Sequence, residues 1–243
     1  MDLPLNHILR GDCCKVLADL PDACVDFVLT DPPYLVNYRD RSGRSLAGDR
    51  QADWMEPAFR QMYRLLKPDS LCVSFYGWSR VDVFFRAWKA CGFRVVGHLT
   101  FPKRYTSSSR LVRYQHENAY LLAKGDPRPG DRVIGDVIDW IYSGNLSHPT
   151  QKPTAVLRPL VEAFCPRGGI VLDPFAGSGS SCLAARSTGR QFIGVELDAN
   201  YHLAATQRLR AFATKLAALA WPLAPESLGP VDGTPASAAA VLP

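Results

Sequence analysis

The 243-residue sequence lacks the features that would place it in a membrane or in a secretory pathway. No apolar run approaches the roughly 18 residues that a membrane-spanning helix needs. The opening residues, MDLPLNHILRGD, contain neither the charged region nor the apolar region of a signal peptide. We therefore expect a cytoplasmic protein without a membrane partner.

Paired cysteines are also missing. The seven cysteines are an odd number, and no two of them have the CxxC spacing of a zinc site. This set favours free thiols in a reducing compartment over a disulfide framework. We expect no metal ion.

Acids are few or absent in two basic segments, 36–50 and 101–113, although the net charge of the chain is only +5. Their cations include Arg39, Arg41 and Arg44 in the first segment and Lys103, Arg104, Arg110 and Arg113 in the second. Basic segments interleaved with aromatic residues suit contact with phosphates. A solvated basic surface explains the same charges equally well.

Short apolar runs alternate with segments of helical periodicity along the chain. The predicted strands are 25–30, 71–76, 93–101, 117–123, 169–173 and 191–196, and the predicted helices are 53–67, 79–91, 153–165, 180–188 and 199–219. This alternation predicts a doubly wound α/β fold with a mostly parallel sheet. We expect one domain over residues 1–220 and a disordered tail, rich in Pro, Ala, Gly and Ser, over 221–243.

The first predicted strand ends in an unusual way, at VDFVLTDPPY. Pro32 and Pro33 have no backbone N–H and a fixed φ, so they cannot extend a strand or lie inside a helix. Asp31 precedes a proline and is therefore also non-helical. The sequence predicts a stiff loop that holds a carboxylate and the ring of Tyr34 at the end of a strand.

A second strand ends in an aspartate followed by a glycine-rich turn, in GGIVLDPFAGSGS. Gly177 and Gly179 allow a tight turn and let a ligand approach the backbone. The next strand ends in Glu196, which lies 19 residues after Gly177 and is placed to accept hydrogen bonds from ribose hydroxyls. The turn has neither the full GxGxxG pattern nor a GxxxxGK[ST] lysine, so an adenosyl ligand without phosphates, such as S-adenosylmethionine, fits best.

Four motifs together resemble the signature set of bacterial DNA amino-methyltransferases. They are TDPPY at 30–34, HPTQKP at 148–153, DPFAGSGS at 173–180 and GVELD at 194–198. The target-amine motif precedes the cofactor motif, a circularly permuted order similar to that of the beta class, which methylates N6 of adenine or N4 of cytosine. GDCCKVLADLP at 11–21 resembles the usual opening of that class. The resemblance implies a bacterial, phage or mobile-element source.

The resemblance also implies a Rossmann-like, S-adenosylmethionine-dependent fold and assigns the site residues. The catalytic tetrapeptide would be Asp31, Pro32, Pro33 and Tyr34. The cofactor would contact Asp12, Cys13, His148, Thr150, Lys152, Asp173, Phe175, Gly177, Ser178, Gly179, Glu196 and Leu197. Two alternatives stay open, because Asp12 would also suit a helix cap and HPTQKP would also suit a helix entry.

The tetrapeptide suits chemistry at an exocyclic amine, whose lone pair is delocalised into the ring. Hydrogen bonds from both amine protons, to the Asp31 carboxylate and the Pro32 carbonyl, would free that lone pair for direct transfer of a methyl group. Tyr34 would stack on a base that has been flipped out of the duplex. A catalytically silent protein that binds DNA or S-adenosylmethionine is the alternative from a different class.

The substrate is expected to be double-stranded DNA. An aspartate at the first position of the tetrapeptide goes mostly with N6 of adenine in this family, with N4 of cytosine as the alternative. Only about 25 residues, roughly 125–147, remain for a recognition segment, so a short or relaxed target sequence is predicted. A homodimer and a separately encoded restriction nuclease are further expected partners.

Overall fold

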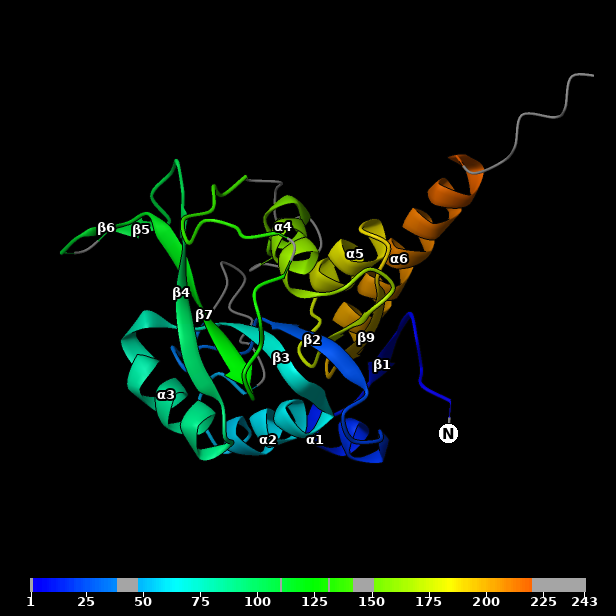
Figure 1. Cartoon of the computed structure of the whole chain (residues 1–243). Coiled ribbons are helices and arrows are strands. Elements are labelled where there is room, and N and C mark those ends of the chain that lie inside the picture. Colours follow the sequence, from blue (N-terminus) through cyan, green and yellow to red (C-terminus); the bar gives the residue numbers. More distant parts are fainter. Residues whose placement is uncertain (1, 39–47, 110, 131, 142–150, 220–243) are drawn as a thin grey trace, which may run out of the picture.

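A seven-stranded sheet crosses the centre of the molecule (Figure 1). The computed structural model describes residues 2–38, 48–109, 111–130, 132–141 and 151–219. The strand order is β1-β9-β8-β2-β3-β7-β4. The strands are β1 (His7–Arg10), β2 (Val25–Thr30), β3 (Leu66–Phe75), β4 (Arg94–Pro102), β7 (His116–Lys124), β8 (Ile170–Asp173) and β9 (Gln191–Glu196). Strand β7 runs antiparallel to the other six strands, which are parallel to one another, and this confirms the mostly parallel α/β prediction.

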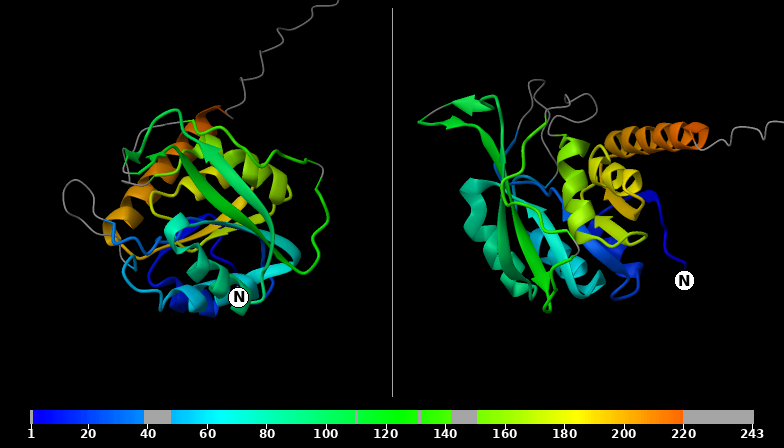
Figure 2. Two further views of the ribbon diagram at one scale, coloured as in Figure 1. Left: turned by 90° about the vertical axis from the view of Figure 1, so that its left-hand side faces the viewer. Right: turned by 45° about the horizontal axis from the view of Figure 1, so that its top comes forward.

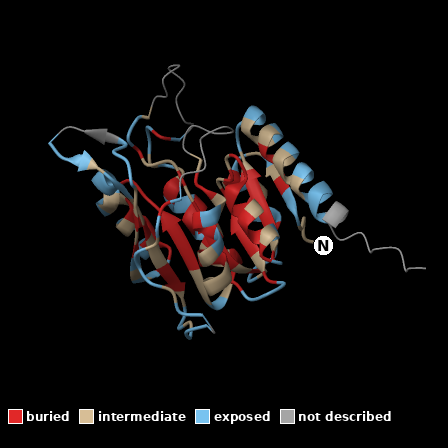
Figure 3. Ribbon diagram, turned by 90° about the horizontal axis from the view of Figure 1, so that it is seen from above, coloured by how far each residue is buried: buried red, intermediate tan, exposed pale blue. Residues whose placement is uncertain are grey.

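Helices cover both faces of the sheet, as a doubly wound fold requires (Figures 1 and 3). One face carries α1 (Cys13–Val16), α2 (Met55–Leu65) and α3 (Val81–Ala90), and the other carries α4 (Thr154–Phe164), α5 (Ser180–Ser187) and α6 (Ala199–Leu219). Each face has its own apolar cluster, and the sheet lies between them. Two short 3-10 turns, Leu17–Asp19 and Trp78–Arg80, complete the described helices.

The helix α2 shows why these segments fold as they do. Its buried side chains, Met55, Phe59, Met62 and Leu65, recur every three or four residues and therefore form one apolar stripe. Phe59 is fully buried and packs edge-on against Trp88 of α3, with ring centroids 6.1 Å apart. Truncating a side chain of this kind costs about 3–5 kcal/mol in such cores.

The predicted boundaries mostly agree with the structure within two residues, and β9 and α6 agree at both ends. The predicted start of the second strand at residue 71 is wrong, because β3 begins at Leu66. Leu66 pairs with Val25, and the register then shifts before Leu71 pairs with Phe27. The segment Lys67–Asp69, which carries a proline and a positive φ at Asp69, therefore bulges within a strand instead of separating two elements.

Three short strands escaped sequence analysis. Strand β1 pairs in parallel with β9 at the edge of the sheet. Strands β5 (Ser108–Ser109) and β6 (Arg113–Tyr114) form a two-stranded ribbon that rises from the ends of β4 and β7 (Figure 2). The ribbon lies within the second basic segment, so part of that segment is a hairpin.

The segment 136–140 lies along the open edge of β4. The Thr100 N–H donates to the Asp136 carbonyl at 2.8 Å, and the Ile138 N–H donates to the Thr100 carbonyl at 2.9 Å. These bonds continue the sheet beyond β4 and satisfy backbone groups that an edge strand would otherwise expose.

The chain order creates a crevice at one place in the sheet. Strands β2 and β8 are parallel neighbours, but α2 follows β2 on one face and α5 follows β8 on the other. Connections that leave to opposite faces open a gap beyond the carboxyl ends of the two strands, where ligands bind in such sheets. The two loops singled out in the sequence, after Thr30 and after Leu172, both lie there.

Candidate active site

A single cavity of about 330 Å³ joins the two predicted motifs at the carboxyl ends of β2 and β8. The tetrapeptide Asp31 to Tyr34 lines one part, and the turn from Asp173 to Ser178 lines another. Glu196, at the end of β9, also lines it. Residues about 140 positions apart in the sequence therefore share one cavity, as the motifs predicted.

The carboxylate of Asp31 faces this cavity and remains partly open to solvent, with 24% of its side chain exposed. One oxygen accepts a hydrogen bond from the Tyr34 hydroxyl at 2.7 Å, and the other accepts one from the Lys152 ammonium at 2.7 Å. Burial and the neighbouring Asp31 carboxylate raise the pKa of Tyr34, so its hydroxyl keeps the proton that it donates. The carboxylate is thus held in a defined orientation.

Lys152 is the cation of the site. Its side chain is 8% exposed, and its ammonium also lies 3.1 Å from the Tyr34 hydroxyl and 4.9 Å from the centroid of the Phe75 ring. Burial alone would lower the pKa of Lys152, but the Asp31 and Glu117 carboxylates outweigh burial and raise it. The structure brings this lysine, expected beside the cofactor, to the Asp31 carboxylate.

Asp173 is buried at the end of β8. Its carboxylate accepts hydrogen bonds from the Ser181 hydroxyl and, at 3.0 Å, from the Phe175 N–H. Burial raises the pKa of this carboxyl to about 7 in spite of these donors. A carboxyl poised in this way can bind a cationic amino group, which would keep it ionised.

The glycine turn and Glu196 hold each other in place. The Gly177 N–H donates to one Glu196 oxygen at 2.7 Å, and the Asp198 N–H donates to the other at 2.8 Å. Each carboxylate oxygen keeps a lone pair for a ligand hydroxyl. Burial, opposed by these two N–H groups, raises the pKa of Glu196.

Gly179 does not take part in the way that was predicted. Its φ of 74° explains the glycine, but a Cβ there would meet Ala205 of α6 and Ile8 of β1, each at 3.3 Å. The residue therefore permits α5 to pack against these two elements and faces away from the ligand cavity. Its neighbours Ser178 and Ser180 do line the cavity.

The remaining predicted cofactor residues divide into two groups. Asp12, Cys13, Phe175, Ser178 and Leu197 all line the cavity. Asp12 also caps α1, because its side chain accepts the Cys14 N–H at 2.8 Å, so its two proposed roles are compatible. His148 and Thr150 lie outside the described residues.

Trp54 and Asp49 are among the cavity residues that sequence analysis missed. Trp54 lines the cavity and packs edge-on against Phe175, with ring centroids 5.0 Å apart. Asp49 is buried there, and its carboxylate accepts the N–H groups of Val36 at 3.3 Å and Tyr38 at 2.5 Å. Asp49 thereby ties together the two described ends of the first basic segment. Only its place between arginines, which need a counter-charge, hinted at it.

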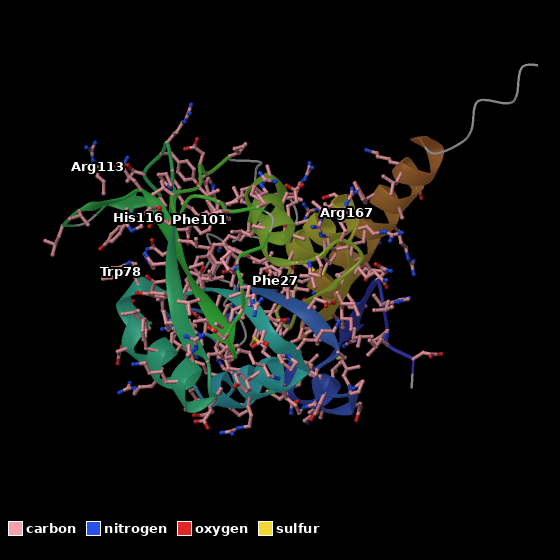
Figure 4. The ribbon with its side chains drawn as sticks, in the orientation of Figure 1. Phe27, Trp78, Phe101, Arg113, His116 and Arg167 are labelled. Atoms are coloured by element: carbon pink, nitrogen blue, oxygen red, sulfur yellow. The ribbon has the colours of Figure 1, made fainter. Side chains whose placement is uncertain are left out.

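The structure describes only some of the residues predicted to contact DNA. Arg39, Arg41, Arg44 and Arg110 lie outside the described residues. Arg104 and Arg113 are exposed, and Arg113 points away from the body of the protein in Figure 4. The expectation for Lys103 is wrong, because its side chain is 6% exposed and forms an ion pair with Glu117. A buried, paired ammonium cannot reach a phosphate.

An aromatic pair extends the exposed basic surface around the ribbon. Trp78, which is 59% exposed, stacks on Tyr114 of β6 with ring centroids 5.7 Å apart and an interplanar angle of 21°. Aromatic faces of this kind can contact nucleic-acid bases. Trp78 lies after β3, outside both basic segments, so no local pattern marked it.

Comparison with known proteins agrees with this geometry. A family model described as "DNA methylase", for N6 and N4 methyltransferases, matches residues 25–207. A protein named "Putative methylase YubD" of Escherichia coli K12 is 56% identical over 207 residues, covering 85% of this chain and 91% of that protein. The DNA adenine methyltransferase YhdJ of the same organism is 27% identical, over 83% of this chain and 82% of that protein.

Solved structures share the fold. The protein TTHA0409 of Thermus thermophilus, complexed with S-adenosyl-L-methionine, is 26% identical with a TM-score of 0.66, over 84% of this chain and 93% of that one. The cytosine-N4-specific PvuII DNA methyltransferase is 15% identical with a TM-score of 0.68, over 87% of this chain and 94% of that one. At that identity the second likeness concerns the fold alone.

Proposed function

This chain belongs to the DNA methylase family of N6 and N4 methyltransferases, and on that premise we propose that it methylates the N6 amine of adenine in double-stranded DNA. The methyl donor is S-adenosyl-L-methionine. The observation that carries the proposal is the single cavity in which the partly exposed Asp31 carboxylate faces the glycine turn and Glu196.

The turn side of the cavity suits the donor. Glu196 offers a fixed carboxylate to ribose hydroxyls, and Asp173 offers one to the amino group of the methionine part. Phe175 and Trp54 supply apolar surface for the adenine ring. The donor brings an activated methyl group, because a sulfonium sulfur is a good leaving group, so neither a metal nor a covalent enzyme intermediate is needed.

The tetrapeptide side suits the acceptor. Asp31 and the carbonyl of Pro32 each accept a hydrogen bond from one N–H group of the amine, which makes the nitrogen lone pair available for attack on the methyl carbon. The carbon–sulfur bond breaks as the carbon–nitrogen bond forms, and the amine then loses one proton, for which Asp31 is the nearest acceptor. The base reaches this pocket by leaving the duplex, because its amine is otherwise paired inside the helix.

Adenine is proposed over cytosine because the tetrapeptide begins with aspartate. The chain is similar to the adenine methyltransferase YhdJ and shares its fold with a cytosine-N4 enzyme, so the product must be identified chemically. The experiment is to incubate the purified protein with S-adenosylmethionine labelled with tritium in the methyl group and with DNA, RNA or protein. We expect label in N6-methyladenine from DNA, whereas label in N4-methylcytosine would reassign the base.

The substitution Asp31→Ala tests the assignment of the two halves of the cavity. We expect transfer to fall by at least a thousandfold, because the amine loses the carboxylate that accepts its hydrogen bond, while the dissociation constant for S-adenosylhomocysteine stays within about threefold. Calorimetry measures the binding. Loss of binding together with activity would mean that the two halves are misassigned.

A catalytically silent binder of DNA or S-adenosylmethionine is the competing function. The intact arrangement of Asp31, Tyr34 and Glu196 favours the enzyme. Binding of both ligands without labelled product, under conditions in which a related enzyme is active, would favour the silent protein.

Target selection is proposed to be relaxed. The segment 125–147 is short, and residues 136–140 within it are used to extend the sheet. Sequencing of genomic DNA after expression tests this, and modification confined to a motif of six or more defined bases would contradict it. We also propose a homodimer in solution and leave a separately encoded nuclease as a partner to be sought in the same genome.

A further inference from the structure

A row of alternating charges connects the base of the β5–β6 ribbon to the carboxylate of Asp31. Lys103, directly after β4, forms an ion pair with Glu117 of β7. Lys152 forms the ion pair with Asp31, and its ammonium lies 4.9 Å from the ring centroid of Phe75, which pairs with Ala119, two residues after Glu117 on β7. The order is therefore cation, carboxylate, cation, carboxylate. All four side chains are at most about a quarter exposed, with 6% for Lys103, 22% for Glu117, 8% for Lys152 and 24% for Asp31.

The middle of this row is electrostatically coupled. Burial would raise the pKa of Glu117, but Lys152 and Lys103 outweigh burial and lower it. Glu117 in turn helps to keep Lys152 charged, since it and Asp31 together overcome the effect of burial on the lysine. Each cation thus lies between or beside carboxylates, and removing one charge leaves its neighbour buried without a full partner.

The row matters for Asp31 because of what the reaction asks of it. The carboxylate must be ionised and turned toward the cavity to accept a proton of the target amine. Lys152 holds one of its oxygens and Tyr34 holds the other. If Glu117 were neutral, Lys152 would be a buried cation with only Asp31 to balance it, and it would be bound more closely to the oxygen that the substrate needs.

We propose that Glu117 and Lys103 are positioning residues for methyl transfer, and that both act on Asp31 through Lys152. The proposal rests on the proposed function. It gives the ribbon a second role, because Lys103 lies just before the ribbon in the chain and Glu117 lies just after it. The Lys103 N–H also donates to the Gln115 carbonyl at 2.6 Å. The hairpin that carries Arg113 is therefore built on residues that set the geometry of the acceptor.

The test compares Glu117→Gln and Lys103→Met with matched changes at the other end of the same strands. Arg94, at the start of β4, pairs with Asp126, just beyond β7, on the surface. We expect Glu117→Gln and Lys103→Met each to lower kcat at least tenfold, with binding of S-adenosylhomocysteine within about twofold of the unsubstituted protein. Asp126→Asn and Arg94→Met should leave kcat unchanged within about twofold.

A double-mutant cycle separates positioning from a general effect on folding. In the Lys152→Met background, adding Glu117→Gln should lower the single-turnover rate by less than about twofold, because the ammonium through which Glu117 acts on Asp31 is already absent. If the two losses instead multiply, Glu117 does not act through Lys152 and the proposal is overturned. Lys103→Met in the same background tests the row from its other end, should Glu117→Gln not fold.

The unsubstituted protein distinguishes this proposal from the proposed function. If it transfers no methyl group to DNA, the proposed function fails. If it is active and Glu117→Gln and Lys103→Met, folded and binding S-adenosylhomocysteine normally, are as active as the unsubstituted protein, the function stands and the positioning role is wrong.

Discussion

At the scale of single residues, three of the carboxylates that line the cavity lie in different environments. Asp31 is tied to a cation, Glu196 to two backbone N–H groups, and Asp173 lies buried with a hydroxyl and one N–H. These surroundings match three partners, namely an amine that must lose a proton, ribose hydroxyls and a cationic amino group. In the proposed function the same side-chain chemistry would serve three tasks, because the environment of each carboxylate differs.

Asp173 leads to a prediction about pH. Burial raises the pKa of its carboxyl from 3.8 to about 7, so between these values the folded protein holds a proton that the unfolded chain releases. This stabilisation is therefore fully present below about pH 4 and is lost as the pH rises through 7, with an upper limit of about 4 kcal/mol. In the ligand-free protein, we expect Asp173→Asn to raise the thermal midpoint at pH 8 and to leave it nearly unchanged at pH 5.

The affinity for S-adenosylmethionine should depend on pH in the opposite sense to this stabilisation. In the proposed function the amino group of S-adenosylmethionine pairs with the ionised Asp173 carboxylate, so the affinity of the protein for S-adenosylmethionine should rise as the pH increases from 6 to 8, and Asp173→Asn should flatten that rise. Calorimetric titration at three pH values measures it. An equally steep dependence in the variant would show that another group binds the amino function.

At the scale of elements, the ribbon and the strands that carry it form one arm of the sheet (Figure 2). Among the described residues near the ribbon, Arg104 and Arg113 are exposed cations, and Trp78 stacks on Tyr114 of the ribbon. The buried charges of the arm, Lys103 and Glu117, instead face Lys152. One short stretch therefore presents one set of charges to solvent and another to the active site.

The exposed arginines give a prediction about DNA binding. We expect Arg104→Ala and Arg113→Ala each to weaken binding to DNA of any sequence and to reduce the slope of log affinity against log salt by about one, because each removes one phosphate contact. Fluorescence anisotropy at several salt concentrations measures this. Arg94→Ala, at the opposite end of β4, is the control, and an unchanged slope in both ribbon variants would place the DNA elsewhere.

At the scale of the whole molecule, the cavity lies where the chain changes from one face of the sheet to the other. The two apolar clusters meet across β2 and β8, so a ligand there contacts parts of both halves of the fold. No helix in the part of the chain that the structure describes is long and apolar enough to cross a membrane. All seven cysteines carry free thiols, as their spacing predicted.

Ligand binding at such a place should stabilise the protein as a unit. S-adenosylhomocysteine at about 100 times its dissociation constant adds about 2.7 kcal/mol to the free energy of unfolding. For a domain of this size we expect the thermal midpoint to rise by roughly 5–10 °C. Differential scanning fluorimetry measures the shift, and Glu196→Gln should reduce it because the ribose loses its strongest acceptor. A full shift in that variant would contradict the assignment of Glu196.

The sequence predicted the motifs of the site better than their contacts. Asp31, Asp173 and Glu196 each end a strand, and parallel strands bring such ends to one edge, so their meeting follows from local pattern. The partner of Asp31 did not follow, because Lys152 lies 121 positions away on a segment with no regular structure before α4. Its place depends on packing between elements far apart in the sequence, which a local sequence pattern does not predict.

The fold shows the same division. Long amphipathic segments such as α2 were predicted because their period is visible over several turns. Strand β1, with four residues, and the ribbon β5–β6, with two residues in each strand, are too short for a period and exist only through their partners. The bulge at Lys67–Asp69 was mistaken for a break because proline and a turn-forming acid usually end a strand.

The position of α6 has a consequence for circular permutation of such a protein. His202 of this helix reaches the backbone of Ile8 in β1, so the last described helix packs on the first strand of the chain. A peptide bridge between them would close the polypeptide into a loop, and reopening that loop near residue 125 would leave β2, β8 and everything around them in place. The order of the two motifs along the chain would then not change the arrangement of the residues in the folded cavity.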